Sequence, residues 1–440
     1  MKKTVLFAIG AVFVCLGGLR LLGTSAPQGA SPERTGAWTS LGPYGGDMVG
    51  LARNPKSPGE LFAVSSSWPS QVWRSTNSGT SWTRQSMVYQ QINDVAVDPQ
   101  TQSTLYLISY GYLHKSTDKG KNFTNHHLPS GFSSDYGRIA VHPTNPNTII
   151  IAGMFYYDNV NYKTDIAVAK TTNGGASWTL KRFANSADYG YGYDVVFAKS
   201  NPNYVYLCGY DQKNSVDTAR VYVSKNGGST WKSVAAPAIF NGQYPACYTL
   251  HVDPRDPKKA WIGHYNGIAR TTNAGSTWKA QQTPQMTWVT SIAADSSNPK
   301  ILYARKYDAS NKIHYALKST DGGVTWKATG DGVYGKSYRI LAAGSKVHIA
   351  TATGIFLSKN GGSTWNPCHS GIRGANIKAF AASPSSPNTI YAGIHGYALF
   401  KTTNGGSAWT TCGTFSGSLL VGSIAVLPTN PNTIYVKPNG

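Results

Sequence analysis

The stretch Ser75-Thr-Asn-Ser-Gly-Thr-Ser-Trp82 decides the fold of this chain, because its pattern, Ser/Thr-x-Asn/Asp-x-Gly-x-x-Trp, occurs eight times. The copies are Ser75–Trp82, Ser116–Phe123, Thr171–Trp178, Ser224–Trp231, Thr271–Trp278, Ser319–Trp326, Ser358–Trp365 and Thr402–Trp409. Between Ser75 and Thr402 the motif recurs about every 47 residues, a spacing typical of propeller blades or solenoid turns. The sequence therefore predicts a repeat fold.

Each copy of the motif, called the box below, lies between two short apolar, β-rich runs and so predicts the turn of a β-hairpin. Ser, Thr, Asn and Asp side chains accept backbone N–H groups in such turns, and the Gly suits a positive φ. The acceptors of the third motif position are Asn77, Asp118, Asn173, Asn226, Asn273, Asp321, Asn360 and Asn404. The final aromatic position, which we expect to pack between sheets, is Trp82, Trp178, Trp231, Trp278, Trp326, Trp365 or Trp409 in seven copies. Six copies have Asn, which cannot replace a catalytic carboxylate, so we assign the boxes a structural role.

A second phrase precedes each box: an apolar strand, a Pro-rich turn and a Tyr-containing strand, as in Arg138–Ala152. Other copies start near Gly50, Asp94, Asp194, Thr249, Ser291 and, in degenerate form, Arg339. Two strands here and two around the box make four strands per unit, as in a propeller blade. We predict an all-β fold, a single β-propeller of four-stranded blades, with eight blades favoured and nine as the alternative.

The two ends of the repeat region suggest how the ring closes. Residues 423–436 repeat the second phrase without a following box, and Trp38-Thr-Ser-Leu41 is similar to the strand after a box. We therefore expect N- and C-terminal strands to share one blade, which would remove exposed sheet edges.

These motifs resemble the Asp-box (bacterial neuraminidase repeat) superfamily, over nearly the whole chain from Trp38 to Val436. The superfamily includes sialidases, xyloglucanase-type glycoside hydrolases, sortilin-type receptors and photosystem II assembly factors. The resemblance implies the propeller fold but leaves the activity open, because its members share an architecture and differ in chemistry.

The chain is strongly basic, with 40 Lys and Arg against 19 Asp and Glu and a net charge of +21. Such a charge attracts anionic partners such as acidic glycans or anionic surfaces. The basic residues are scattered, as at Lys225 and Lys359 within boxes, and form no run. We therefore do not expect specific nucleic-acid binding. A protein partner stays the alternative to a glycan or anionic polymer.

The N-terminus predicts export to the periplasm, the cell surface or the medium. Lys2-Lys3 precedes an apolar run from Thr4 to Leu19, the shape of a signal peptide or retained anchor. We divide the chain into residues 1–30 (signal peptide or anchor), 31–37 (linker) and 38–440 (propeller). A membrane association is expected only through the anchor alternative.

Four cysteines remain after removal of Cys15 with a signal, an even number that fits an oxidising compartment. We expect a Cys208–Cys247 disulfide. Cys368 and Cys412 are weaker candidates, because equivalent positions on neighbouring blades fan apart. The scattered His residues and the absence of Cys-x-x-Cys predict no metal site, and no cofactor motif is present.

An enzyme is the less favoured interpretation. The chain has two glutamates, Glu33 and Glu60, and lacks the sialidase Phe/Tyr-Arg-Ile-Pro motif; Tyr338-Arg-Ile-Leu341 is the nearest match. Xyloglucanase-type enzymes fit better, since two Asp can serve as acid and base. Their Arg-Thr-Asp motif, however, is replaced here by Val64-Ser-Ser-Ser-Trp-Pro69.

Tyr-rich insertions are the candidate ligand-binding elements, because Tyr suits contact with sugars or a protein partner. The candidates are Tyr156, Tyr157, Tyr189, Tyr191, Tyr193 and Arg339. Asp135 and Asp194 are the carboxylate candidates for catalysis, because each precedes an inner strand. No Ser/His/Asp signature is visible in the sequence.

The favoured interpretation is therefore an exported, non-catalytic binding or scaffold module for a glycan or anionic surface. The alternatives are a xyloglucanase-type glycoside hydrolase with an Asp pair and a protein-binding assembly or adhesion factor.

Overall fold

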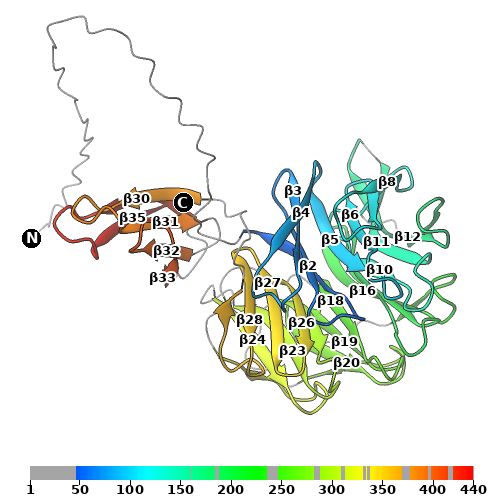
Figure 1. Ribbon diagram of the computed structural model, residues 1–440. Coiled ribbons are helices and arrows are strands. Elements are labelled where there is room, and N and C mark those ends of the chain that lie inside the picture. Colours follow the sequence, from blue (N-terminus) through cyan, green and yellow to red (C-terminus); the bar gives the residue numbers. More distant parts are fainter. Residues whose placement is uncertain are drawn as a thin grey trace, which may run out of the picture. The chain divides into compact units, whose positions relative to one another are not determined.

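The computed structural model describes residues 46–158, 160–183, 188–234, 246–281, 288–308, 313–330, 333, 337–368, 377–394, 398–414 and 420–439. These residues fold as β-strands joined by turns (Figure 1). The expected segments 1–30 and 31–37 and the start of the third lie outside the described residues. Among the residues that are described, no helix is long and apolar enough to cross a bilayer.

Seven antiparallel sheets follow one another along the chain from Met48 to Pro367, each in sequential strand order except for the short strand Phe132–Ser133 of the third sheet, which pairs out of order with the strand Ile149–Asp158. The first sheet comprises β1 (Met48–Arg53), β2 (Leu61–Ser65), β3 (Ser70–Ser75) and β4 (Thr83–Val88), and the second comprises β5 (Ile92–Val97), β6 (Leu105–Ser109), β7 (Tyr112–Ser116) and β8 (Thr124–His127). The third sheet comprises β9 (Phe132–Ser133), β10 (Ile139–Val141), β11 (Ile149–Asp158), β12 (Lys163–Thr171) and β13 (Thr179–Phe183). The fourth comprises β14 (Tyr189–Phe197), β15 (Val205–Lys213), β16 (Val216–Ser224) and β17 (Lys232–Val234).

The fifth sheet comprises β18 (Cys247–Val252), β19 (Ala260–His264), β20 (Gly267–Thr271) and β21 (Lys279–Ala280). The sixth comprises β22 (Val289–Ala294), β23 (Leu302–Asp308), β24 (Ile313–Ser319) and β25 (Lys327–Ala328). The seventh comprises β26 (Ser337–Ala343), β27 (Lys346–Thr351), β28 (Gly354–Ser358) and β29 (Asn366–Pro367). An eighth sheet comprises β30 (Ile377–Ala382), β31 (Ile390–Ile394), β32 (Ala398–Thr402) and β33 (Thr410–Thr414). The hairpin β34 (Leu420–Val426) and β35 (Ile434–Asn439) packs against β30 and β31.

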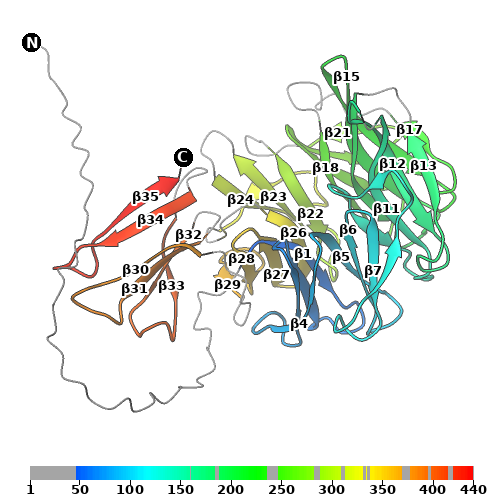
Figure 2. The ribbon, with the colours of Figure 1, turned by 90° about the horizontal axis from the view of Figure 1, so that it is seen from above.

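Within the described part of the chain, the first seven sheets form a closed circuit of contacts. The first strands of neighbouring sheets pack together around it, and β26 of the seventh sheet returns to β1 (Figure 2). Met48, Leu51 and Trp82 of the first sheet share a buried apolar cluster with Ala350 and Leu357 of the seventh. This burial, with a hydrogen bond from Trp82 Nε1 to the Cys368 carbonyl (2.7 Å), joins the ends of the circuit.

The all-β propeller with four-stranded blades is confirmed, but the eight blades and the shared closing blade are not. The first sheet obtains all four strands from Met48–Val88, so it needs no strand from the C-terminal end. The apolar edge of the first sheet is covered by the seventh sheet. From the sequence we expect a blade shared by the N- and C-terminal strands at this place.

The boxes form tight turns that their own side chains hold. In the first box, Ser75 Oγ accepts the Gly79 N–H (2.9 Å) and Asn77 Oδ1 accepts the Ser81 N–H (2.9 Å). Gly79 has a φ of 82°, a conformation that favours glycine. In the second box Asp118 takes the place of Asn and accepts the same bond from Asn122 N (3.0 Å). The hydrogen-bonding oxygen, rather than the charge, is what the turn requires.

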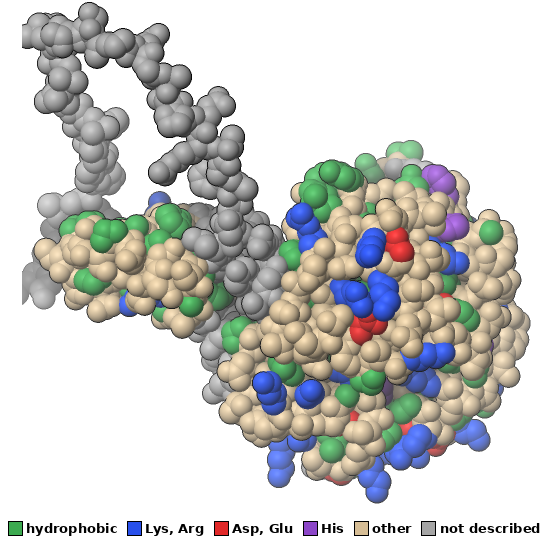
Figure 3. All heavy atoms as spheres, in the orientation of Figure 1, with side chains coloured by type: hydrophobic (Ala, Val, Ile, Leu, Met, Phe, Trp, Pro, Cys, Tyr) green, Lys and Arg blue, Asp and Glu red, His purple; other side chains and the backbone are tan. Residues whose placement is uncertain are grey.

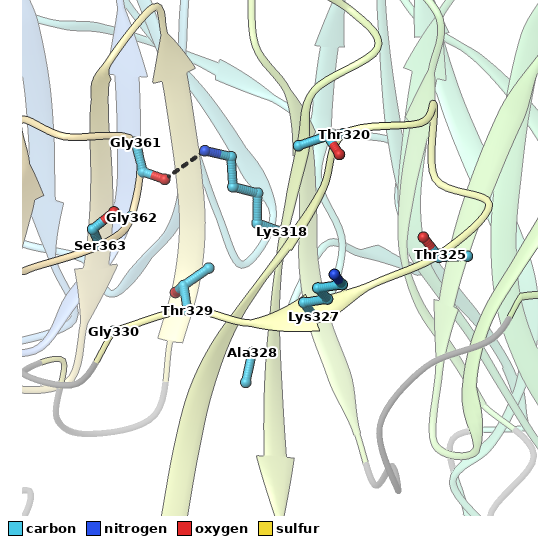
Figure 4. Close-up of a pocket in the computed structure, with 10 residues that line it drawn as sticks. All are labelled: Lys318, Thr320, Thr325, Lys327, Ala328, Thr329, Gly330, Gly361, Gly362 and Ser363. Carbon is cyan, nitrogen blue, oxygen red and sulfur yellow. Dashed lines mark hydrogen bonds between the residues drawn. The ribbon is translucent and has the colours of Figure 1, made fainter.

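Boxes also border the preceding sheet at shallow grooves, as the fifth and seventh boxes show. Figure 4 shows one of about 440 Å³, in which Lys318 of β24 donates to the Gly361 carbonyl of the next box (3.0 Å). A similar groove lies between Lys232 of β17 and Gly275. Hydroxyl and backbone groups dominate both grooves, which contain no aromatic platform beyond Trp231.

Lys and Arg side chains are spread over the face in Figure 3 instead of forming a single patch. This agrees with the scattered positions of the basic residues along the sequence.

The four cysteines are free thiols, contrary to the expected Cys208–Cys247 disulfide. Cys208 Sγ lies 3.4 Å from the backbone carbonyl of Cys247 and so faces its main chain. Cys368 packs at the junction of the first and seventh sheets, whereas Cys412 lies in β33 of the eighth. This weaker candidate pair is therefore not joined by a disulfide either.

Candidate functional site

The first strands of the circuit share a local irregularity that shapes its centre. A register shift skips one residue near the start of β1, β5, β14, β18, β22 and β26, as in a β-bulge. A bulge re-aims the side chain of the extra residue. The skipped residues, Val49, Asn93, Tyr193, Tyr248, Thr290 and Tyr338, all line one cavity. The repeated bulge thus directs one side chain from each of six sheets to a common central cavity.

This central cavity has a volume of about 380 Å³. Asp135, Tyr136 and Arg138 from the third sheet and Trp288 from the loop before β22 complete its wall. Its lining combines aromatic faces with a few polar groups, the composition typical of a small-ligand or sugar site.

A second cavity of about 510 Å³ adjoins the first. It is lined by Trp68 of the β2–β3 loop, by Ser109, Tyr110 and Tyr112 of the β6–β7 hairpin, and by Gln90. The two linings share Gln91, Asn93, Asp135 and Tyr136. The two cavities therefore form one elongated site with Asp135 at the junction.

The aromatic side chains of this site form a connected wall. Tyr136 meets Tyr191 edge to face at 5.5 Å between ring centroids, and Tyr191 stacks on Tyr210 at 5.4 Å. Tyr193 stacks on Tyr210 at 6.0 Å and contacts Tyr248 at 5.4 Å. Such ring pairs fix the orientation of each face. The outward rings of Trp68 and Tyr136, 69% and 61% exposed, remain available to a ligand.

Asp135 is the carboxylate of the joined cavities. Its backbone N–H donates to Ser133 Oγ (3.2 Å), which helps hold the turn before β10. Burial raises the pKa of the Asp135 carboxyl group, and a hydrogen bond between that carboxyl group and the Ser133 side chain opposes the rise. A half-buried carboxyl group with a raised pKa at a cavity wall is suited to donate a proton.

Below the central cavity lies a cluster of opposite charges from four sheets. Asp94 is fully buried and accepts two hydrogen bonds from Arg339, one of them 3.2 Å from Nε. Arg138 Nη1 lies 3.5 Å from Asp94 Oδ1. Asp194 is held by the Leu250 N–H (2.9 Å) and by Thr249 Oγ1 (3.3 Å). Burial raises the pKa of Asp194, while Arg339 and Arg138 oppose that rise.

The structure therefore separates the residues predicted from sequence. Asp135 and Tyr193 line the site and Tyr191 supports it, whereas Asp194 and Arg339 belong to the buried charge cluster.

The other three predicted residues, Tyr156, Tyr157 and Tyr189, are absent from the linings of both cavities. Burial raises the pKa of Tyr156, and the nearby Asp135 raises it further. Tyr157 contacts the Arg182 guanidinium at 5.7 Å.

Sequence reasoning missed a carboxylate that is bonded to the β2–β3 loop, the loop that contributes Trp68 to the second cavity. Asp47, which directly precedes β1, accepts a hydrogen bond from Ser66 Oγ (2.6 Å), and its backbone carbonyl accepts the Ser66 N–H (2.9 Å). Its Oδ1 is buried and has no hydrogen-bond partner. Ser66 lies in the loop after β2 that the sequence analysis found to lack a carboxylate. These two bonds hold the Asp47 carboxylate against that loop.

Within the described ranges, no group of three His, Cys, Asp or Glu side chains is arranged to hold a metal ion.

Comparison with known proteins identifies sequence relatives. A family model described as "Sortilin, neurotensin receptor 3" matches residues 70–219. Xyloglucanase Xgh74A of Acetivibrio thermocellus is 24% identical over 293 residues, 54% of this chain and 32% of the relative. A xyloglucanase of Hypocrea jecorina is 24% identical over 339 residues, 65% of this chain and 39% of the relative. The chain thus spans about a third of the length of the curated relatives it matches.

Solved structures with the same fold include a GH74 xyloglucanase from Xanthomonas campestris, with a TM-score of 0.60 and 14% identity. That match covers 89% of this chain and 71% of the other. YCF48 from Cyanidioschyzon merolae matches with a TM-score of 0.51 and 14% identity, over 73% of this chain and 98% of the other. At these identities the likeness shows the fold alone.

Proposed function

We propose that this protein, a member of the Asp-box β-propeller superfamily, is a glycoside hydrolase that cleaves a glucan of the xyloglucan class. The observation that supports this most directly is the position of Asp135. It stands where two cavities with aromatic walls join, and burial raises its pKa. A polymer lying along both cavities would pass the carboxyl group.

The non-catalytic binding or scaffold module, our favoured interpretation from sequence, is contradicted by the relatives. The matching curated proteins are named xyloglucanases, which favours the hydrolase alternative. The small number of glutamates and the replacement of the Arg-Thr-Asp motif by Val64–Pro69 favoured the wrong interpretation, because an Asp pair from other positions can perform the same acid–base chemistry. The glycan partner is retained as the substrate, and export of the protein stays a prediction.

Asp135 is assigned the role of general acid. Its raised pKa keeps a larger fraction of the carboxyl group protonated near neutral pH, so it can protonate the glycosidic oxygen as the bond breaks. The exposed faces of Trp68 and Tyr136 offer platforms for sugar rings on the second-cavity side, and Trp288 does so in the central cavity.

Glycosidases of either stereochemical course use a second carboxyl group. We assign this role to Asp47, because its Oδ1 has no hydrogen-bond partner and its other oxygen is oriented by Ser66. Asp194, the second candidate from sequence, is assigned a positioning role, since its bonds to Leu250 and Thr249 hold it within the charge cluster.

The test is to incubate the protein with xyloglucan and with acidic polysaccharides, and to analyse soluble products by mass spectrometry. We expect oligosaccharides from xyloglucan, and a loss of about 100-fold or more in rate for Asp135→Asn and Asp47→Asn. Asp118→Asn is the matched control, because six other boxes carry Asn at that position. An absence of products from every polymer would overturn the hydrolase proposal. An undiminished rate for Asp135→Asn would overturn the assignment of the acid.

A further inference from the structure

Ser109, which lines the second cavity, begins a chain of hydrogen-bonded side chains that glycoside hydrolysis does not use. Ser109 ends β6, His114 lies in the middle of β7, and Asn125 lies opposite His114 on β8. Ser109 Oγ is 2.8 Å from His114 Nε2, and His114 Nδ1 is 2.8 Å from Asn125 Oδ1. The imidazole of His114 is therefore within hydrogen-bonding distance of a hydroxyl nucleophile on one side and of an orienting amide on the other.

We propose that Ser109, His114 and Asn125 form a catalytic triad that hydrolyses carboxylic esters, and that its substrate is an O-acylated glycan. The geometry is that of a nucleophile bonded to its base and a base bonded to its orienting group. The glycan class rests on the proposed function and on the aromatic walls of the shared site. The ester chemistry rests on the triad alone.

The hydrogen bonds define which nitrogen of His114 carries the proton. The amide oxygen of Asn125 only accepts, so Nδ1–H donates to it and Nε2 keeps its lone pair. Nε2 can then accept the Ser109 hydroxyl proton. Burial lowers the pKa of His114, against the opposing influence of Asn125, so the imidazole is neutral at neutral pH and Nε2 can accept a proton.

The nucleophile is placed at a cavity wall and not in the packed core. Ser109 lines the second cavity, although its residue is only 1% exposed, and His114 is equally buried behind it. Tyr110 and Tyr112 follow Ser109 in the β6–β7 hairpin and line the same cavity. A short acyl group on a sugar that contacts these rings can reach Oγ, while the base stays shielded from water.

Two side-chain amides in the same lining can stabilise the oxyanion. The Ser109 hydroxyl donates a hydrogen bond to Gln90 Oε1 (2.5 Å), so its proton has to turn from Gln90 to His114 Nε2 before the reaction. A half-turn of this amide presents its NH₂ group at that place once the Ser109 proton is directed to His114. Asn93 Nδ2, which donates to the Ser134 carbonyl at 3.3 Å, supplies a second donor. Amide donors of this kind stabilise the negative charge of tetrahedral intermediates.

The reaction balances without a further reactant than water. Ser109 Oγ bonds to the acyl carbon as its proton moves to His114 Nε2. The bond from the acyl carbon to the sugar oxygen then breaks, and His114 returns the proton to that oxygen. A water molecule next adds to the acyl-Ser109 carbon and gives its proton to His114. Ser109 Oγ leaves with this proton, so the products are a free sugar hydroxyl and a carboxylic acid.

The experiment uses the whole chain with two probes, 4-nitrophenyl acetate for turnover and a fluorophosphonate for covalent labelling. We expect one label per protein on Ser109, located by peptide mass spectrometry, and release of acetate from O-acetylated xyloglucan. Ser109→Ala should abolish labelling, and His114→Gln should lower turnover by about 100-fold or more. Asn125→Asp, which keeps the acceptor, should retain turnover where Asn125→Leu loses it.

Ser291→Ala is the matched control, because Ser291 is a buried strand serine of the sixth sheet outside both cavity linings. Circular dichroism and the urea midpoint establish that each variant is folded. Hydrolysis by the wild type no faster than in buffer, or equal labelling of Ser109→Ala, would overturn the proposal. 4-Nitrophenyl acetate and the fluorophosphonate contain no glycosidic bond, so turnover or labelling of these probes without glucan cleavage, or the reverse, distinguishes a failure of the glucanase proposal from a failure of the triad.

Discussion

Replacing Asp94 with Asn should destabilise the circuit of sheets, because Asp94 is the buried anion on which two cations converge. Its side chain is fully buried, whereas the side chains of Arg339 and Arg138 are 23% and 17% exposed. Removing one partner of a buried ion pair costs about 3–5 kcal/mol. Asp194 still lies near both guanidinium groups, so we expect Asp94→Asn to lower the free energy of unfolding by about 3 kcal/mol.

The assay is equilibrium unfolding in urea, followed by tryptophan fluorescence. A loss of about 3 kcal/mol reduces the ratio of folded to unfolded protein about 100-fold and lowers the midpoint at an unchanged denaturant slope. Asp118→Asn makes the same chemical change in a box turn and should cost less than about 1 kcal/mol. A double-mutant cycle with Arg339→Gln should show a coupling of about 1–3 kcal/mol. Equal losses for Asp94→Asn and Asp118→Asn would refute the reasoning.

Three further predictions concern pH, substrate contact and backbone packing. Burial lowers the pKa of His348 to about 4, below its unfolded value, so its contribution to stability is complete above about pH 6.5 and is lost as the pH falls toward 4. Urea midpoints from pH 7 to 4.5 should therefore fall more steeply for the wild type than for His348→Gln, and parallel curves would contradict this. Trp68→Ala should raise KM for the glucan roughly 2- to 10-fold at little changed kcat, since a stacking contact contributes about 0.5–1.5 kcal/mol; a changed kcat with constant KM would argue against a platform role. Gly137→Ala should cost about 1–3 kcal/mol and reduce glucan cleavage, because the added Cβ would lie 1.8 Å from the Ala152 carbonyl oxygen beside Asp135. Gly59→Ala, whose Cβ would have no neighbour within 3.6 Å, is its control, and equal urea midpoints for the two would count against the predicted clash.

The charge cluster has a counterpart in the sequence, because charged residues occur at equivalent positions of the repeat. The second phrase starts near Asp94, Asp194 and Arg339, and these are the residues that directly follow the bulge in their strands. Equivalent positions of a propeller converge on its centre, so charges of opposite sign at such positions predict a central cluster. By contrast, no spacing along the chain indicated that Asp47 reaches Ser66.

The sequence by itself determined the repeat unit, its box turns and the four-stranded sheets, because these depend on local hydrogen bonds and alternating apolar residues. Ser75, Asn77 and Gly79 close their turn within a few residues, so their pattern is legible without the rest of the chain. Only the tertiary structure decided that the seventh sheet closes on the first, because that depends on which apolar surfaces bury one another across about 300 residues. It likewise decided that Asp135 joins two cavities and that Ser109, His114 and Asn125 align. Those contacts arise from strand register and sheet packing, which no motif in the chain records.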